Sequence, residues 1–210
     1  MLAKLSDIAI VTMGQSPKSS AYNSNQDGLP FLQGRTTFGD KYPYFDTWTT
    51  EWNKEANKGD ILFTVRAPVG DINIATTRIA IGRGIAAIAP KSVDSLYLYY
   101  LLQANRHNFL TSSAGTIFDS INKDALESIV LNVHNKDEQH HIVNTIGSVD
   151  DLIENYQQEI DKICELLDKS LLQYPNRVEI SAYSPKLIKS GINSFANSKE
   201  YLDTSAIEGV

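Results

Sequence analysis

Apolar residues recur at alternating steps of four and three between residues 142 and 167, and this repeat constrains the fold more than any other feature of the sequence. Such spacing is the heptad pattern of a coiled coil, in which one stripe of a helix packs against a partner helix. The predicted seam consists of Ile142, Ile146, Val149, Ile153, Tyr156, Ile160, Ile163 and Leu167. Because an isolated helix cannot bury such a stripe, the sequence predicts a long helix that needs a partner helix.

Start and stop signals delimit this helix. Asn135 followed three residues later by Glu138 is a variant of a capping box, and Pro175 prevents continuation. A helix over residues 136–174 would be about 58 Å long at roughly 1.5 Å per residue. Gly147, inside it, costs about 1 kcal/mol relative to alanine and suggests a bend or a close contact at that point.

The formal net charge of −6 belongs to the same segment. Residues 1–134 are balanced, residues 135–175 carry three basic and nine acidic side chains, and residues 176–210 are again balanced. A negative chain argues at first against a nucleic-acid partner, because phosphate binding usually shows as excess base. Since the excess lies on the helix alone, the neutral first domain remains compatible with DNA binding.

The sequence of residues 1–134 predicts strands and loops, in contrast to the long helix that follows. Short runs rich in β-branched and aromatic residues alternate with Gly, Pro, Asn and Ser clusters, which is typical of strands joined by polar loops. Strands are predicted at residues 8–12, 61–65, 72–76, 85–89 and 129–133. Two helices interrupt them, one from about Asp94 to Phe109 and a short one capped by Asn122. The expected fold class is α+β: a mixed, β-rich domain (1–134), one long coiled-coil α-helix (135–175), and a tail or the start of another domain (176–210).

Several classes of function are disfavoured. The sequence lacks the phosphate-loop, dinucleotide-loop, nucleophile-elbow and zinc-protease motifs, so we expect no catalytic residues and no metal site. The single cysteine, Cys164, excludes an intrachain disulfide. No apolar stretch approaches the roughly 18–20 residues that span a bilayer, and the first residues lack the apolar run of a signal peptide. We therefore expect a soluble, cytoplasmic protein with no membrane partner.

The loops of the first domain supply the remaining signal, because they combine glycine with polar and basic side chains. Arginine on guanine, glutamine on adenine, and serine, threonine or lysine on phosphate are contacts that read duplex DNA. The candidate DNA-binding residues are Lys18, Ser20, Tyr22, Gln33, Arg35, Arg66, Arg83 and Thr116. Plainer interpretations stay open: Arg66 as a structural arginine that holds Asp71, and residues 82–84 as a simple turn between Ile81 and Ile85.

Several segments taken together carry a family pattern. They are LSDI (5–8), MGQSPK (13–18) with Tyr22, PFLQG (30–34), GDILFTVRAPVGDIN (59–73), IGRG (81–84), GTIF (115–118) and EQ (138–139). In order and spacing these segments resemble the target recognition domain and following helix of type I restriction-modification specificity (S) subunits. The resemblance covers residues 1 to about 174, and residues 185–210 resemble the opening of a second recognition domain.

The resemblance implies a non-catalytic subunit that binds double-stranded DNA at a bipartite sequence, with each recognition domain reading one half. The long helices would set the gap between the half-sites and dock methyltransferase (M) subunits, in a complex completed by restriction (R) subunits. No cofactor is expected on this chain, since S-adenosylmethionine, ATP and Mg belong to the partner subunits. A full subunit has two recognition domains and two long helices, so one of each suggests a truncated, split or half-size subunit, with a homodimer through the helix as one arrangement.

Two other interpretations stay open at the level of sequence. The chain would be a coiled-coil DNA-binding adaptor or protein-interaction module outside restriction-modification, or it would be the recognition part of a DNA methyltransferase. Binding of S-adenosylmethionine by the isolated chain, measured by calorimetry, separates the methyltransferase from the other interpretations.

Overall fold

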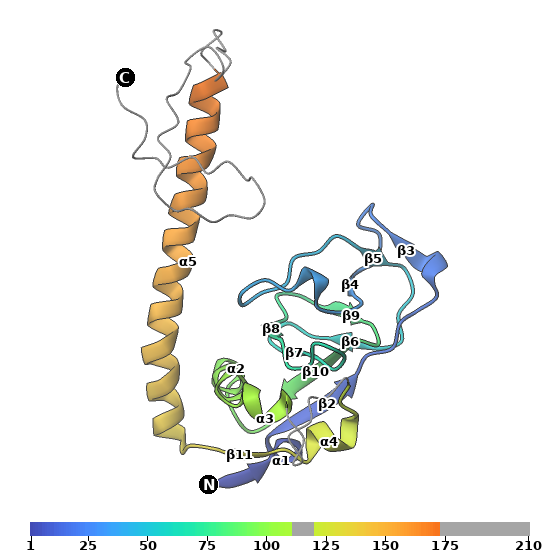
Figure 1. Ribbon diagram of the computed structural model, residues 1–210, viewed down its shortest axis with the longest axis vertical. Coiled ribbons are helices and arrows are strands. Elements are labelled where there is room, and N and C mark those ends of the chain that lie inside the picture. Colours follow the sequence, from blue (N-terminus) through green and yellow to red (C-terminus); the bar gives the residue numbers. More distant parts are fainter. Residues whose placement is uncertain (111–119, 173–210) are drawn as a thin grey trace, which may run out of the picture. The chain divides into compact units, whose positions relative to one another are not determined.

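A four-stranded antiparallel sheet in the order β2-β10-β7-β8 forms the centre of the first domain (Figure 1). The structure is a computed structural model that describes residues 1–110 and 120–172. The strands of this sheet are β2 (Ala9–Met13), β7 (Ile61–Thr64), β8 (Ile72–Ile74) and β10 (Ile85–Pro90). They correspond to four of the strands expected from the sequence, with ends that differ by up to two residues.

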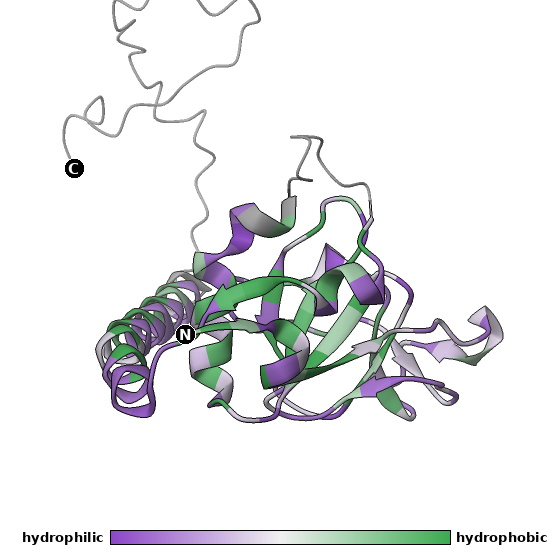
Figure 2. Cartoon of the chain, turned by 90° about the horizontal axis from the view of Figure 1, so that it is seen from below, coloured by the Kyte–Doolittle hydropathy of each residue, from purple (hydrophilic) through white to green (hydrophobic). Residues whose placement is uncertain are grey.

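The central strands β7 and β10 are apolar except for Thr64, because both of their faces are covered. In β7, Ile61 and Phe63 belong to one buried cluster, which includes α2, whereas Leu62 between them belongs to a second cluster on the other face. In β10, Ile88 and Ile85 divide in the same way. Since successive side chains of a strand point to opposite faces, two covered faces give an unbroken apolar run. Figure 2 shows hydrophobic residues gathered on these strands.

A five-stranded sheet in the order β3-β5-β4-β9-β6 contributes to the second cluster. Its strands are β3 (Tyr22–Asn23), β4 (Leu29–Leu32), β5 (Trp48–Thr49), β6 (Glu55–Ala56) and β9 (Ile79–Ile81). All pairs are antiparallel except β4 with β9, where Phe31 lies opposite Ala80. These strands were not expected from the sequence. Most are only two or three residues long, and such short runs carry little periodicity.

The segment at residues 82–84 connects the two larger sheets as the turn between β9 and β10. The interpretation of this segment as a turn between Ile81 and Ile85 is therefore confirmed. A third, two-stranded sheet pairs β1 (Leu2–Lys4) with β11 (Val130–Asn132), so the last strand of the domain lies beside the first. The chain thus returns to its beginning before the long helix starts (Figure 1).

Short helices cover the first buried cluster. They are α1 (Leu5–Ile8), α2 (Ser95–Ala104), α3 (Arg106–Leu110) and α4 (Lys123–Glu127), with the 3-10 turns η1 (Ser19–Ala21) and η2 (Arg35–Thr37) on the loops. The expected cap of α4 is present, since the Asn122 side-chain oxygen accepts from the amide of Ala125 (2.9 Å). The single helix expected over residues 94–109 is wrong: α2 ends at Ala104. The Asn105 side chain donates to the carbonyl of Leu101 (2.8 Å), a local bond that competes with helix continuation.

The long helix expected from the heptad repeat is α5 (Lys136–Leu172). Its capping box is formed as expected: the amide of Glu138 donates to Asn135 Oδ1 (3.0 Å), and the amide of Asn135 donates to Glu138 Oε2 (3.1 Å). By contacts, the chain divides inside α5 into Met1–Ile153 and Glu154–Val210. The expected tail or second domain at 176–210 lies outside the described residues.

Candidate nucleic-acid interface

Three loops meet beside the β9–β10 turn: residues 14–18 after β2, residues 33–37 after β4, and residues 82–84 themselves. Their backbones are in direct contact. The amide of Gly84 donates to the carbonyl of Gln33 (3.1 Å), and a side chain at Gly84 would bring its Cβ to within 2.6 Å of the same oxygen. The glycine pattern noticed in the sequence therefore has a physical basis, because only a residue without Cβ permits this approach.

The first loop is equally tight. The amides of Gly14 and Gln15 donate to the carbonyls of Ile85 (2.8 Å) and Ile81 (2.9 Å). A Cβ on Gly14 would collide with the backbone oxygen of Gly82 and lie 2.6 Å from that of Ile85. These contacts join the backbones of the three loops, so the Cα positions from which their side chains extend are set relative to one another.

Polar side chains then connect the loops above this backbone contact. Ser16 Oγ accepts from the amide of Arg83 (3.1 Å) and donates to Gln33 Oε1 (3.1 Å). One hydroxyl thus links a residue from each of the three loops. The contact orients the Gln33 amide through its oxygen, while both Gln33 and Arg83 remain exposed to solvent.

The three loops border a groove of about 790 Å³. Tyr22 forms part of its wall: its ring packs against Phe31 with centroids 4.7 Å apart, and its hydroxyl donates to the carbonyl of Pro17 (3.1 Å). The lining residues are Gln15, Ser16, Pro17, Ser19, Tyr22, Phe31, Gln33, Gly34, Thr36, Thr37, Asp46, Thr47 and Arg83. Most are amides, hydroxyls and an arginine, which suit hydrogen bonds to base edges and phosphates.

Three of the eight candidate residues, Tyr22, Gln33 and Arg83, line this groove. Lys18 and Ser20 are exposed, and each is next in sequence to a lining residue, Lys18 to Pro17 and both to Ser19. The candidate Thr116 lies outside the described residues.

Arg35 and Arg66 have other surroundings. Arg35 Nη1 lies 2.9 Å from Asp71 Oδ2, and Arg106 pairs with the other oxygen of the same carboxylate. The alternative interpretation of Arg66 as the arginine that holds Asp71 is wrong for the described residues, because Arg35 and Arg106 take that place. Arg66 is exposed beside β7, and its backbone forms an isolated bridge with Ser120.

Sequence reasoning missed several residues of this surface. Ser16 lies inside a loop that the glycine pattern marked, but its hydroxyl had no feature that set it apart from its neighbours. Thr36 and Thr37 directly follow Arg35 and could have been found as part of the same polar loop. Asp46 and Thr47 approach the groove from a segment without motif or periodicity, so no sequence signal pointed to them.

The first half of α5 packs on the domain through a polar contact and a glycine. Asp150 accepts from the Tyr100 hydroxyl (2.6 Å) and pairs with Lys41 Nζ (3.3 Å). Burial, reinforced by the hydrogen bond to Asp150, raises the pKa of Tyr100 well above its usual range. One turn earlier, Gly147 is buried, and a Cβ there would lie 3.6 Å from Leu96. Gly147 thus packs against α2, but these neighbours leave room for a Cβ, so the position does not require glycine.

The predicted seam differs along its length. Ile142 is partly buried and packs against the domain core, whereas Ile146 is 42% exposed. The other six members, from Val149 to Leu167, are between 52% and 60% exposed. Two leucines that the heptad did not include, Leu152 and Leu166, extend the exposed apolar surface. Within residues 1–110 and 120–172, this is a long apolar stripe that the chain itself leaves open to solvent.

The described part of the chain has neither a metal-binding cluster nor a membrane-spanning helix. It contains no group of three or more His, Cys, Asp or Glu side chains placed to hold a metal ion. None of its helices combines the length and apolar character that crossing a bilayer requires.

Comparison with known proteins identifies the class to which this fold belongs. The family described as "Type I restriction modification DNA specificity domain" matches residues 1–165, so the chain belongs to that family. The family resemblance inferred from the sequence is thereby confirmed, as is the α+β fold. Specificity subunits are not themselves enzymes, in agreement with the expectation of a non-catalytic chain.

Particular relatives support the same assignment. The putative type I restriction enzyme MjaX specificity subunit of Methanocaldococcus jannaschii is 40% identical over 155 residues, which are 73% of this chain and 36% of the relative. The MjaIX specificity subunit of the same organism is 29% identical over 182 residues, 81% of this chain and 41% of the relative. The chain thus spans about two fifths of the length of these curated relatives.

Solved structures agree with the sequence relatives. The HsdS subunit from Thermoanaerobacter tengcongensis superposes with a TM-score of 0.64 at 32% identity, over 76% of this chain and 39% of that one. A chain from a study of complex assembly and conformational transition of the type I R-M system gives a TM-score of 0.66 at 33% identity, over 82% and 44% of the two chains.

Proposed function

We propose that this chain reads one half of a bipartite DNA target for a type I restriction-modification complex, with the groove beside the β9–β10 turn as its base-reading surface. The observation that carries the proposal is the groove itself, where a glutamine, an arginine and several hydroxyls lie on three loops fixed by backbone hydrogen bonds. Family membership supports it, since the matching family is named for DNA specificity. A fixed array of donors and acceptors is what discrimination between bases requires.

The charge distribution limits how much affinity this domain can supply. Residues 1–134 carry equal numbers of acidic and basic side chains. Because phosphate attraction provides most of the sequence-independent affinity for DNA, a neutral domain binds weakly by itself. We therefore assign to this chain the choice of sequence, and to the assembled complex, with its M and R subunits, most of the affinity and all of the chemistry that uses S-adenosylmethionine, ATP and Mg.

We also propose that α5 pairs with an equivalent helix, and its exposed apolar stripe supports this. Side chains such as Ile153 and Ile160 are more than half exposed, and burial of apolar surface is worth roughly 25 cal/mol per Å². An antiparallel pair with the helix of a second copy, or of the other half of a longer subunit, would cover the stripe and separate two recognition domains. The same helix pair would dock the methyltransferase subunits.

The base-reading role is tested by methylome sequencing of a strain that carries the intact system with single substitutions in this chain. Gln33→Ala and Arg83→Ala are expected to relax or change the recognised half-site, since a good side-chain pair with a base is worth about 1–3 kcal/mol. Arg78→Ala is the matched control, because Arg78 is also exposed but pairs with Glu55 outside the groove lining. If both groove variants kept the wild-type site, the groove would not be the reading surface.

The spacing role is tested in the same assay by deleting one heptad, Gln157–Ile163. The deletion keeps the apolar register, leaves the contacts of Gly147 and Asp150 intact, and shortens the helix by about 10 Å. The recognised spacer is expected to shorten while both half-sites remain. Gln157→Ala with Gln158→Ala is the control of unchanged length, and an unchanged spacer in the deletion variant would contradict the proposal.

A further inference from the structure

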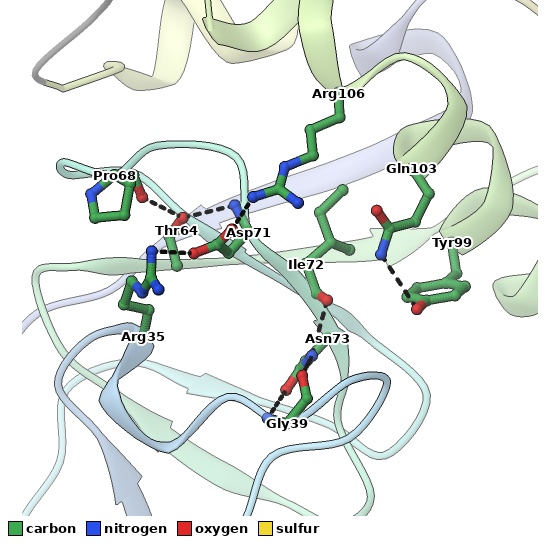
Figure 3. A network of polar contacts seen from close by, with 10 residues as sticks. All are labelled: Arg35, Gly39, Thr64, Pro68, Asp71, Ile72, Asn73, Tyr99, Gln103 and Arg106. Atoms are coloured by element: carbon green, nitrogen blue, oxygen red, sulfur yellow. Dashed lines mark hydrogen bonds and ion pairs between the residues drawn. The ribbon is translucent and has the colours of Figure 1, made fainter. Parts of the chain in front are cut away.

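The carboxylate of Asp71 lies between two arginines that are far apart in the sequence (Figure 3). Arg35, from η2, bonds one oxygen at 2.9 Å, and Arg106, from α3, bonds the other. The carboxylate is only 17% exposed, whereas the side chains of Arg35 and Arg106 are 54% and 44% exposed. The two arginine side chains are therefore open to solvent, whereas the Asp71 carboxylate between them is largely buried.

Backbone contacts fix the position of Asp71. Its amide donates to Thr64 Oγ1 (2.9 Å), and its carbonyl accepts from the amide of Thr64 (3.0 Å). The Thr64 hydroxyl in turn donates to the carbonyl of Pro68 (2.9 Å), and Thr64 is buried. Because the main chain holds the carboxylate, the carboxylate can hold both guanidinium groups in place.

Each arginine keeps donors beyond the bond to Asp71. A guanidinium has five N–H donors, and among the described residues Asp71 is the one ion-pair partner of each. Two positive groups on one carboxylate give these three side chains a combined charge of +1. Converging guanidinium groups with unused donors are the usual recognition element for a phosphate group.

The location relates this pair to the base-reading groove. Arg35 lies between Gly34 and Thr36, both of which line the groove, while its own side chain turns to Asp71. Arg35 and Arg106 also line a hollow of about 260 Å³, and Asp40 is part of the same lining. A second carboxylate there disfavours an anion inside the hollow, so the outward-facing donors are the ones left for a phosphate.

We propose that Arg35 and Arg106 together bind one phosphate of the DNA backbone next to the groove, with Asp71 as the residue that positions both. The inference rests on the proposed function and names a phosphate contact for it. Such contacts fix the register of a protein on the duplex, which base contacts alone do not. The proposal thereby assigns Arg106 a role in DNA binding. No loop motif suggested this role, because Arg106 lies at the start of α3, 71 positions after Arg35 in the chain.

The test measures how the affinity of the chain, assembled with its methyltransferase subunits, for DNA depends on salt. Fluorescence anisotropy with a random-sequence duplex of about 30 base pairs, between about 50 and 200 mM salt, gives the slope of log K against log salt. Arg106→Gln is expected to reduce the slope by about 0.9, the value for one phosphate contact. Arg106→Lys, which keeps the charge, is expected to restore it. Arg35→Gln combined with Arg106→Gln should reduce the slope no further than Arg106→Gln, because Arg106→Gln already leaves Arg35 and Asp71 with no net positive charge for the phosphate.

The matched control is Arg78→Gln. Arg78 is 53% exposed and pairs with the carboxylate of Glu55, so it resembles Arg35 and Arg106 in exposure and in having one carboxylate partner, but it lies away from the groove. If Arg106→Gln and Arg78→Gln gave the same slope as wild type, while thermal unfolding showed both chains folded, the ion pair would be structural and the inference overturned, with the proposed function intact. If the wild-type complex failed to bind the duplex at low salt, the proposed DNA-reading function would fail and the inference with it.

Discussion

The recognition domain and helix α5 contain the same apolar residue types and place them in opposite environments. Ile61, Ile79 and Ile85 in the domain are completely buried, whereas Ile153 and Ile160 in the helix are 60% and 52% exposed. The domain satisfies its apolar residues by covering both faces of a sheet. Within residues 1–110 and 120–172, no second layer covers the stripe of the helix, so the exposed apolar residues are the surface that a partner would bury.

The largest expected effect on the free energy of unfolding comes from replacing leucine by alanine, once in the domain and once in α5. Leu98→Ala, at a fully buried position of α2, is expected to lower the free energy of unfolding by about 2–5 kcal/mol, since it leaves a cavity. Leu167→Ala, at a position 56% exposed, is expected to change it by less than about 0.5 kcal/mol. Denaturant unfolding measures both, at a concentration where light scattering finds a monomer.

The same two variants are also expected to differ in self-association of the chain through α5. Leu167→Ala is expected to weaken helix pairing at high concentration, measured by light scattering, while Leu98→Ala affects folding at every concentration. Equal destabilisation of the monomer by the two changes would contradict the contrast between a closed domain and an open helix.

A smaller effect is expected within the domain, between two glycines of the groove loops. Gly14→Ala would push a Cβ against backbone oxygens of the β9–β10 turn, and such overpacking costs about 1–3 kcal/mol. At Gly34 a Cβ would meet nothing within 4 Å, and φ is −168°, which any residue adopts. Gly34→Ala is therefore the control with little loss in thermal unfolding. A stable Gly14→Ala protein would show that the loops do not need this close contact.

A stabilising change is expected where α5 contacts the domain. At Gly147 an alanine Cβ would lie 3.6 Å from Leu96 and 3.8 Å from the Tyr100 hydroxyl, which are ordinary contacts. Gly147→Ala is therefore expected to raise the free energy of unfolding by about 0.5–1 kcal/mol, because alanine loses less backbone entropy in a helix. Gly147→Leu, too large for the same space, should lower it. A loss of stability with alanine would contradict the observed spacing.

The smallest effect concerns Asp60, whose pKa burial raises above its ordinary value of 3.8 despite a hydrogen bond from the amide of Asn57 (2.8 Å). Because the folded state then binds the proton more tightly than the unfolded state, the stability contribution of this group falls as the pH rises through that range. Asp60→Asn is expected to raise Tm slightly at neutral pH and not below about pH 3. The control is Asp27→Asn at an exposed site, and a lower Tm for Asp60→Asn at neutral pH would contradict the burial argument.

Local signals made much of this fold predictable. The capping residues Asn122 and Asn135 act through atoms three residues away, so the sequence alone identifies the helix starts that they form. The heptad repeat is likewise a property of one helix, and α5 begins at the expected residue and continues to Leu172, the last described residue. The turn at 82–84 follows from glycine chemistry in the same way.

Other elements could not be predicted from the sequence, because contacts between residues far apart in the chain determine them. The five-stranded sheet consists of short strands that become strands only when their neighbours are in place. The arginines on Asp71 show the same limit: Arg66 was the nearest in sequence, yet the chain path brings Arg35 and Arg106 to the carboxylate instead. The groove lining at Asp46 and Thr47 depends on that path as well.

The sequence by itself determined the family, the α+β class, the long helix and the kinds of side chain on the loops, since residue spacing and local backbone chemistry set all of these. Only the tertiary structure decided which loop residues share one groove, which arginines share one acid, and which part of the apolar stripe the chain covers itself. Those outcomes depend on contacts between residues far apart in the chain, and such contacts leave no periodic trace in the order of the residues.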